Sequence, residues 1–171
     1  MTKPDFLGCN LLALCVVLLI APLAAQGSRG PSTPEERARA LELVELLEAT
    51  PEAQEAKEAR RWLVVWLTEI PDITVKVCLA PLGSSTDLDG VPADLTMQQV
   101  FSQAAFLIRN PKAKSGSTEA YVAGVEGALR AYEAMRLSGT VQTLRVFEEL
   151  KKERTAGNLE KVVRKRAKNC K

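Results

Sequence analysis

The chain begins with an apolar segment that has the features of a leader. Removal of this segment would determine which residues form the folded protein. Lys3 is followed by an apolar run from Leu11 to Ala25, which ends in small residues. A basic residue, an apolar stretch and small residues, in this order, are typical of a secretory signal peptide. We therefore expect a signal peptide at residues 1–27, with cleavage after Ala25 or Gly27.

The length of the apolar run favours a cleaved leader over a membrane anchor. A membrane-spanning helix needs about 20 apolar residues, and the run from Leu11 to Ala25 is shorter than that. We expect a secreted or periplasmic protein that meets the membrane only through this segment before cleavage. A protein anchored by an uncleaved leader is the alternative.

Export would place the remaining cysteines in an oxidising compartment, where two cysteines in one domain usually pair. Of the 4 cysteines, Cys9 and Cys15 fall within the leader, which leaves Cys78 and Cys170. These two are far apart in the chain, whereas a redox-active pair usually stands as Cys-x-x-Cys. We therefore predict a structural disulfide between Cys78 and Cys170.

Composition describes a globular chain, because 46% of the residues are hydrophobic and 26% are charged. After cleavage the chain has the size of one ordinary domain. We expect a linker at 28–32 and a single helical domain at 33–171. The net charge of +2 is unevenly spread, since acids concentrate at 35–58 and bases at 151–171.

Helix-start signals recur along the chain and predict its fold class. Thr33-Pro34-Glu35-Glu36 forms a capping box with proline at the first helical position. Similar caps and apolar residues at helical spacing predict further helices. These run from Thr50 to about Glu69, from Asp94 to before Pro111 and the 112–116 tract, from Ser117 to near Gly139, from Val141 to about Thr155, and from Leu159, capped by Asn158, to about Lys168. We predict an all-α, compact bundle of about five to seven helices with one long-range disulfide.

Two segments leave their structure open. In residues 72–82, Ile73, Val75 and Val77 alternate like a strand, but a lone strand has no partner here. We favour a short helix or an extended link. Gly124 and Gly127 lie inside a predicted helix, where glycine is unfavourable, and they indicate close approach by a neighbouring helix or by a partner protein.

The chain contains no histidine, which excludes the Ser-His-Asp and Cys-His catalytic arrangements and the histidine metal sites. No glycine-rich nucleotide fingerprint is present. Asp87-Leu-Asp89-Gly90 resembles the middle of a calcium loop, but Ser85 and Thr96 stand where its end ligands belong. We expect no enzyme, no catalytic residue, no cofactor and no metal.

Carboxylates offer one alternative to a non-enzymatic function. Glu119, Glu126 and Glu133 recur at heptad spacing, so they share one flank of a predicted helix. Two facing acids could hydrolyse an extracellular polymer. Arg130 follows Glu126 by four residues, however, which is the usual arrangement of a solvated, ion-paired helix face.

The basic end of the chain offers a second alternative. Lys161, Arg164, Lys165 and Lys168 share one helix face, and such a stripe attracts anionic lipid or polyanion. No aromatic residue interleaves it, so we expect no nucleic acid partner. The bases could also face the acidic first helix of the same chain.

These observations together predict an exported, non-enzymatic helical protein that binds a protein partner or belongs to an envelope assembly. A carboxylate-dependent hydrolase of an extracellular polymer is one alternative. A binder of an anionic ligand, such as a lipid, a polyanion or another anionic envelope component, through the basic C-terminal helix is the other.

Overall fold

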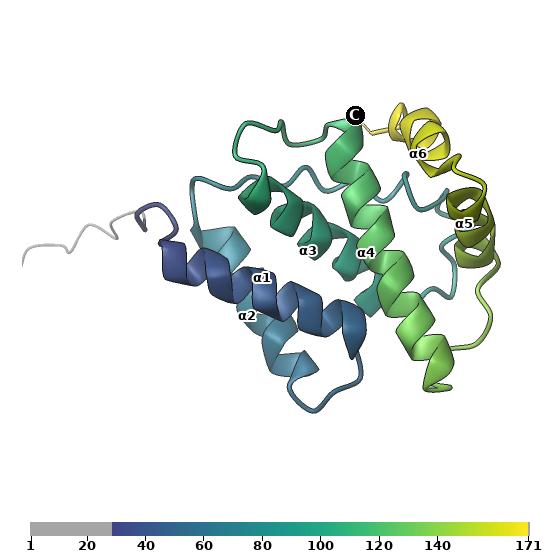
Figure 1. The fold of residues 1–171 in the computed structure, drawn as a ribbon, viewed down its shortest axis with the longest axis horizontal. Coiled ribbons are helices and arrows are strands. Elements are labelled where there is room, and N and C mark those ends of the chain that lie inside the picture. Colours follow the sequence, from purple (N-terminus) through teal and green to yellow (C-terminus); the bar gives the residue numbers. More distant parts are fainter. Residues whose placement is uncertain (1–28, 171) are drawn as a thin grey trace, which may run out of the picture.

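The computed structural model describes residues 29–170, which form six α-helices and contain no strand (Figure 1). The predicted signal peptide lies outside these residues. The all-α fold class is confirmed. The helices are α1 (Pro34–Ala49), α2 (Ala56–Glu69), α3 (Ala93–Arg109), α4 (Thr118–Leu137), α5 (Arg145–Thr155) and α6 (Leu159–Ala167).

Two of the predicted caps form as expected. Thr33 Oγ1 accepts a hydrogen bond from Glu36 N at 3.2 Å, and the Glu36 carboxylate accepts from Thr33 N at 3.0 Å, so the capping box of α1 is complete. Ser117 Oγ likewise accepts from Ala120 N at the start of α4. Gly139, at a φ of 75°, closes the turn after α4.

The predicted start of the second helix is wrong. Thr50 ends α1 instead of opening α2, because its backbone N–H and its hydroxyl both donate to the Leu46 carbonyl. Residues 51–55 then form turns, and α2 begins at Ala56. The same local signal, threonine before proline, therefore serves as a C-cap here and not as an N-cap.

Two other starts differ from the prediction. Asp94 lies inside the first turn of α3, which begins at Ala93 after Pro92. Helix α5 begins at Arg145, after Leu144 in an extended conformation, and Val141 is buried in the connection that precedes the helix. Asn158 does precede α6, but its side chain makes no capping hydrogen bond.

Residues 73–79 are extended and have no strand partner, and a turn follows at 80–82. Of the two structures favoured for this segment, a short helix and an extended link, the helix does not form. Ser115 Oγ accepts from Lys76 N at 2.7 Å, and the Cys78 carbonyl accepts from Gln99 Nε2 at 2.8 Å. The link is therefore held by side chains of neighbouring elements instead of by a β-ladder.

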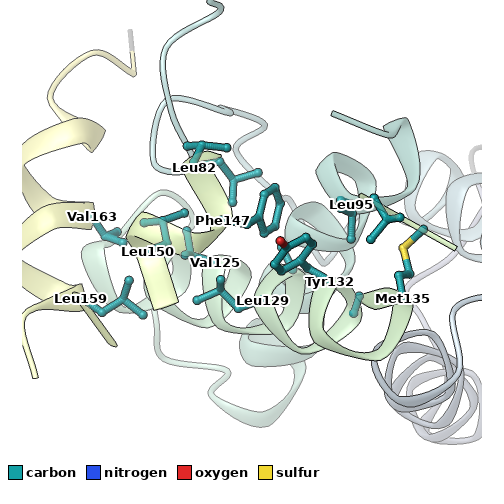
Figure 2. Close-up of a cluster of buried hydrophobic side chains, with 14 of the residues drawn as sticks. Leu82, Leu95, Val125, Leu129, Tyr132, Met135, Phe147, Leu150, Leu159 and Val163 are labelled. Atoms are coloured by element: carbon teal, nitrogen blue, oxygen red, sulfur yellow. The ribbon is translucent and has the colours of Figure 1, made fainter. Parts of the chain in front are cut away.

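The buried side chains form two groups, and Figure 1 shows α4 with α5 and α6 on one side and α1 to α3 on the other. One group joins α4 to α5 and α6, and Figure 2 shows Tyr132 and Phe147 packed together in it, with ring centroids 4.8 Å apart. The second group joins α1, α2 and one face of α3, and it includes Leu47, Leu63, Trp66 and Phe101.

The two helical glycines mark the contact of α4 with α3. A Cβ at Gly124 would lie 2.7 Å from the Gln99 carbonyl oxygen, and a Cβ at Gly127 would overlap the Ser102 hydroxyl. The neighbour that requires these glycines is thus a helix of the same chain.

Candidate functional site

The disulfide joins the extended link to Cys170, which follows α6. Cys78 and Cys170 are bonded, with Sγ atoms 2.00 Å and Cα atoms 5.7 Å apart, so the predicted pairing is confirmed. Within α6 only Leu159 and Val163 are buried. Because this apolar stripe is thin, the covalent bond contributes much of what holds α6 in place.

Arg166 adds a polar attachment of α6 to the link. Its guanidinium is half-buried and donates to the carbonyl oxygens of Pro81 and Leu82. Charge-assisted hydrogen bonds to backbone carbonyls are stronger than neutral ones. This arginine therefore belongs to the packed side of the helix.

The opposite side of α6 carries the predicted bases. Lys161, Arg164, Lys165 and Lys168, which we call the α6 basic face, are all exposed. Arg164 pairs with Glu160 on the same helix, and the three lysines make no ion pair with any residue of the described part of the chain. The structure thus presents these bases to solvent on one surface.

The expectation that these bases face the acidic first helix is wrong. Helix α6 packs against α4 and α5, whereas α1 packs against α2, α3 and α4 on the other side of the molecule (Figure 1). Acids of α1 have other partners, since Glu45 pairs with Arg109 at 2.6 Å and Glu48 with Arg130 at 2.8 Å. The charge of the α6 basic face is therefore not compensated by α1.

The row of carboxylates on α4 has basic partners. Arg154 of α5 lies between Glu126 and Glu133 and pairs with both. A two-carboxylate hydrolase needs open space between its acids for the substrate, and here a guanidinium occupies that space. Glu119 is exposed at the start of α4, where its own backbone N–H and the Ser117 hydroxyl lower the pKa of its carboxyl.

Asp87, from the calcium-like motif, is engaged by protein groups. Its carboxylate accepts from Ser84 Oγ at 2.7 Å and Ser84 N at 3.0 Å, and pairs with Arg145 at 2.8 Å. The Ser84 hydrogen bonds, with help from Arg145, hold the pKa of Asp87 below its ordinary value. Within residues 29–170, no three metal-ligating side chains come together.

A cavity of about 680 Å³, open to solvent, lies at the corner between the end of α3 and the start of α4. Its basic lining residues are Arg109, Lys112 and Lys114. From the sequence we predict only the end of a helix at residues 112–116. The two lysines within this short tract are the signal from which a basic binding site could have been predicted.

No family model, no curated protein and no solved structure matches this chain. Each helix within residues 29–170 is too short or too polar to span a bilayer.

Proposed function

We propose that this is an exported, non-enzymatic binding protein whose contact surface for an anionic partner is the α6 basic face. One observation carries the proposal: four exposed bases lie on a helix whose other side is packed against the protein. Neighbouring bases on a helix face are about 5–6 Å apart at their Cβ atoms. Such fixed spacing suits a partner that also carries closely spaced negative charges.

The geometry favours surface electrostatic contact over membrane insertion. Leu159 and Val163 are buried against the rest of the protein, so α6 has no large apolar side to place in a lipid layer. Attraction between exposed charges is screened by salt. Binding through this face should therefore weaken steeply as salt is added.

Export is part of the proposal, and it is supported by the predicted leader and by the disulfide. A bond between Cys78 and Cys170 is the usual state of paired cysteines in an oxidising compartment. Secretion into the medium and delivery to a periplasm both satisfy this condition.

A matched pair of double variants tests the surface. Lys161→Gln/Lys165→Gln removes two charges from the α6 basic face, and Lys57→Gln/Arg61→Gln removes two from α2; all four side chains are exposed, and none makes an ion pair in the described part of the chain. We expect the α6 variant to leave a heparin column at clearly lower salt than the α2 variant.

Vesicles containing acidic phospholipid, assayed beside heparin, separate a lipid partner from a polyanion. Equal elution of the two variants from heparin and equal binding to the vesicles would contradict the proposal. A weakening confined to one of the two probes would identify the class of partner.

A further inference from the structure

We propose that the cavity between α3 and α4 binds a small single-chain amphiphile with an anionic head, such as an alkyl carboxylate or an alkyl phosphate. The residues that line this site are different from those of the α6 basic face, although Arg164 of that face interacts electrostatically with Glu119 in the lining. Its volume of about 680 Å³ lies within the range of about 300–1,000 Å³ that is usual for small-molecule sites.

The cavity combines apolar and basic surfaces. Phe106 and Ala113, both half-buried, and Pro111 give it apolar walls, while Arg109, Lys112 and Lys114 supply positive charge. Six of the nine lining residues are polar or charged, so a small apolar wall lies beside a largely polar rim. The walls would contact the hydrocarbon, and the bases would contact the head.

The lysines are the bases available to a ligand. Arg109 already pairs with Glu45 at 2.6 Å, whereas Lys112 and Lys114 are exposed and form no ion pair with the described residues. The one acid in the lining, Glu119, lies at the start of α4 near its own backbone N–H and the Ser117 hydroxyl. The lining therefore carries more positive than negative charge.

Turn hydrogen bonds connect residues of the loop that forms the cavity. Within it, Ala113 N donates to the Asn110 carbonyl at 2.8 Å and Ser117 N to the Lys114 carbonyl at 3.1 Å. Gly116, at a φ of 76°, packs against Lys76 of the extended link. A ligand would thus lose little free energy to ordering this loop.

An ammonium group binds carboxylate or phosphate as a point charge without a fixed geometry. Two lysines beside an apolar wall therefore favour a ligand with an anionic head and a hydrocarbon body. They discriminate only weakly between a carboxylate head and a phosphate head. Octanoate and octyl phosphate distinguish these two sources of the same chemistry, and octanol provides the uncharged body alone.

Calorimetric titration of the mature protein with these three compounds tests the proposal. We expect both anions to bind and octanol to bind at least tenfold more weakly. The variant Lys112→Gln/Lys114→Gln should lose at least tenfold in affinity for the anions, with an unchanged circular dichroism spectrum because both side chains are exposed. One control, Lys57→Gln/Arg61→Gln, should bind octanoate as the parent does.

Two results would overturn the proposal. The first is the absence of heat with either anion at millimolar concentration. The second is unchanged anion binding by the Lys112→Gln/Lys114→Gln variant, which is the result expected if the amphiphile enters another surface, such as the apolar groove lined by Val64, Val75 and Phe101. Neither result bears on heparin binding by α6.

Discussion

At the scale of single residues, one carboxylate joins three helices. Glu48 of α1 accepts from Arg130 Nε at 2.8 Å and Nη2 at 2.9 Å on α4, and from Ser102 Oγ at 2.7 Å on α3. Its side chain is only 12% exposed. The missing Cβ of Gly127 makes room for this junction. The glycine therefore serves packing and not flexibility.

We expect Gly127→Ala to destabilise the protein by about 1–3 kcal/mol, the usual cost of overpacking. Helix propensity alone would favour alanine by about 1 kcal/mol, so the sign of the effect identifies the clash. Chemical denaturation measures it. Ala123→Gly, in the same helix, is the control. This variant should be less stable by about 1 kcal/mol, because glycine is less favourable than alanine within a helix. A stabilised Gly127→Ala protein would show that the helices have room for a methyl group.

Asp72 ties the start of the described chain to the end of α2. Its carboxylate accepts from Ser32 N at 2.8 Å, from Ser32 Oγ at 2.7 Å and from Arg37 Nη2 at 2.8 Å. Burial opposes its ionisation, but the hydrogen bonds from Ser32 and Arg37 outweigh it and lower the pKa of Asp72.

A folded-state pKa below the unfolded value gives stability that is present above the unfolded pKa and is lost as the pH falls through the folded pKa. We expect Asp72→Asn to be less stable than the parent at neutral pH, with the difference shrinking in strong acid. Urea denaturation across this pH range measures the difference. A gap that stays constant with pH would show that the charge of Asp72 contributes nothing.

Capping residues were predictable because their partners are three positions away. Thr33 with Glu36, and Ser117 with Ala120, need only the helix itself. The Glu48 junction was not predictable, because Ser102 and Arg130 meet it only after three helices have packed. Gly127 predicted a close contact but did not identify the residues that make it.

At the scale of elements, local signals located helices better than they located helix ends. Thr50 before Pro51 is a possible N-cap. In the structure, however, the Thr50 backbone N–H and hydroxyl both donate to the Leu46 carbonyl, and α1 ends there. Residues 73–79 alternate like a strand, yet with no second strand in the described part of the chain they remain an extended link. In both places, contacts with other residues of the protein determine which of two locally acceptable structures forms.

Helix α6 permits a comparison of two adjacent bases. Arg166 donates to the Pro81 and Leu82 carbonyls, and Lys165 is exposed. We expect Arg166→Ala to cost about 1–3 kcal/mol, as is usual for hydrogen bonds from charged groups, and Lys165→Ala to change stability by less than about 0.5 kcal/mol. Thermal denaturation of the two variants makes the comparison. Equal stabilities would mean that Arg166 adds nothing to the docking of α6.

At the scale of the whole molecule, the disulfide encloses α3 to α6 and leaves α1 and α2 outside the closed loop. All-α class and disulfide pairing were predictable, because both follow from composition, caps and the number of cysteines outside the predicted leader. Which helices meet was not predictable, since packing, the Cys78–Cys170 bond and the Arg166 hydrogen bonds together place α6 against α4 and away from α1.

Removal of the disulfide should destabilise the mature protein by about 2–4 kcal/mol, because the unfolded chain regains the freedom of a long loop. We expect this loss for Cys78→Ala/Cys170→Ala in urea denaturation. Maleimide should label no sulfhydryl of the denatured, unreduced parent and both cysteines after reduction. Labelling of both before reduction would contradict the bond and remove an argument for export.

The closed loop also determines how the molecule would respond to force. A pull applied at Arg29 and Cys170 passes through the sulfur–sulfur bond and bypasses every residue between Cys78 and Cys170. Only the first two helices and their link can then lengthen, to about 170 Å, whereas the reduced chain can reach about 490 Å at the usual span per extended residue. An oxidised molecule stretched between two surfaces would thus keep α3 to α6 shielded from tension while its first third gives way.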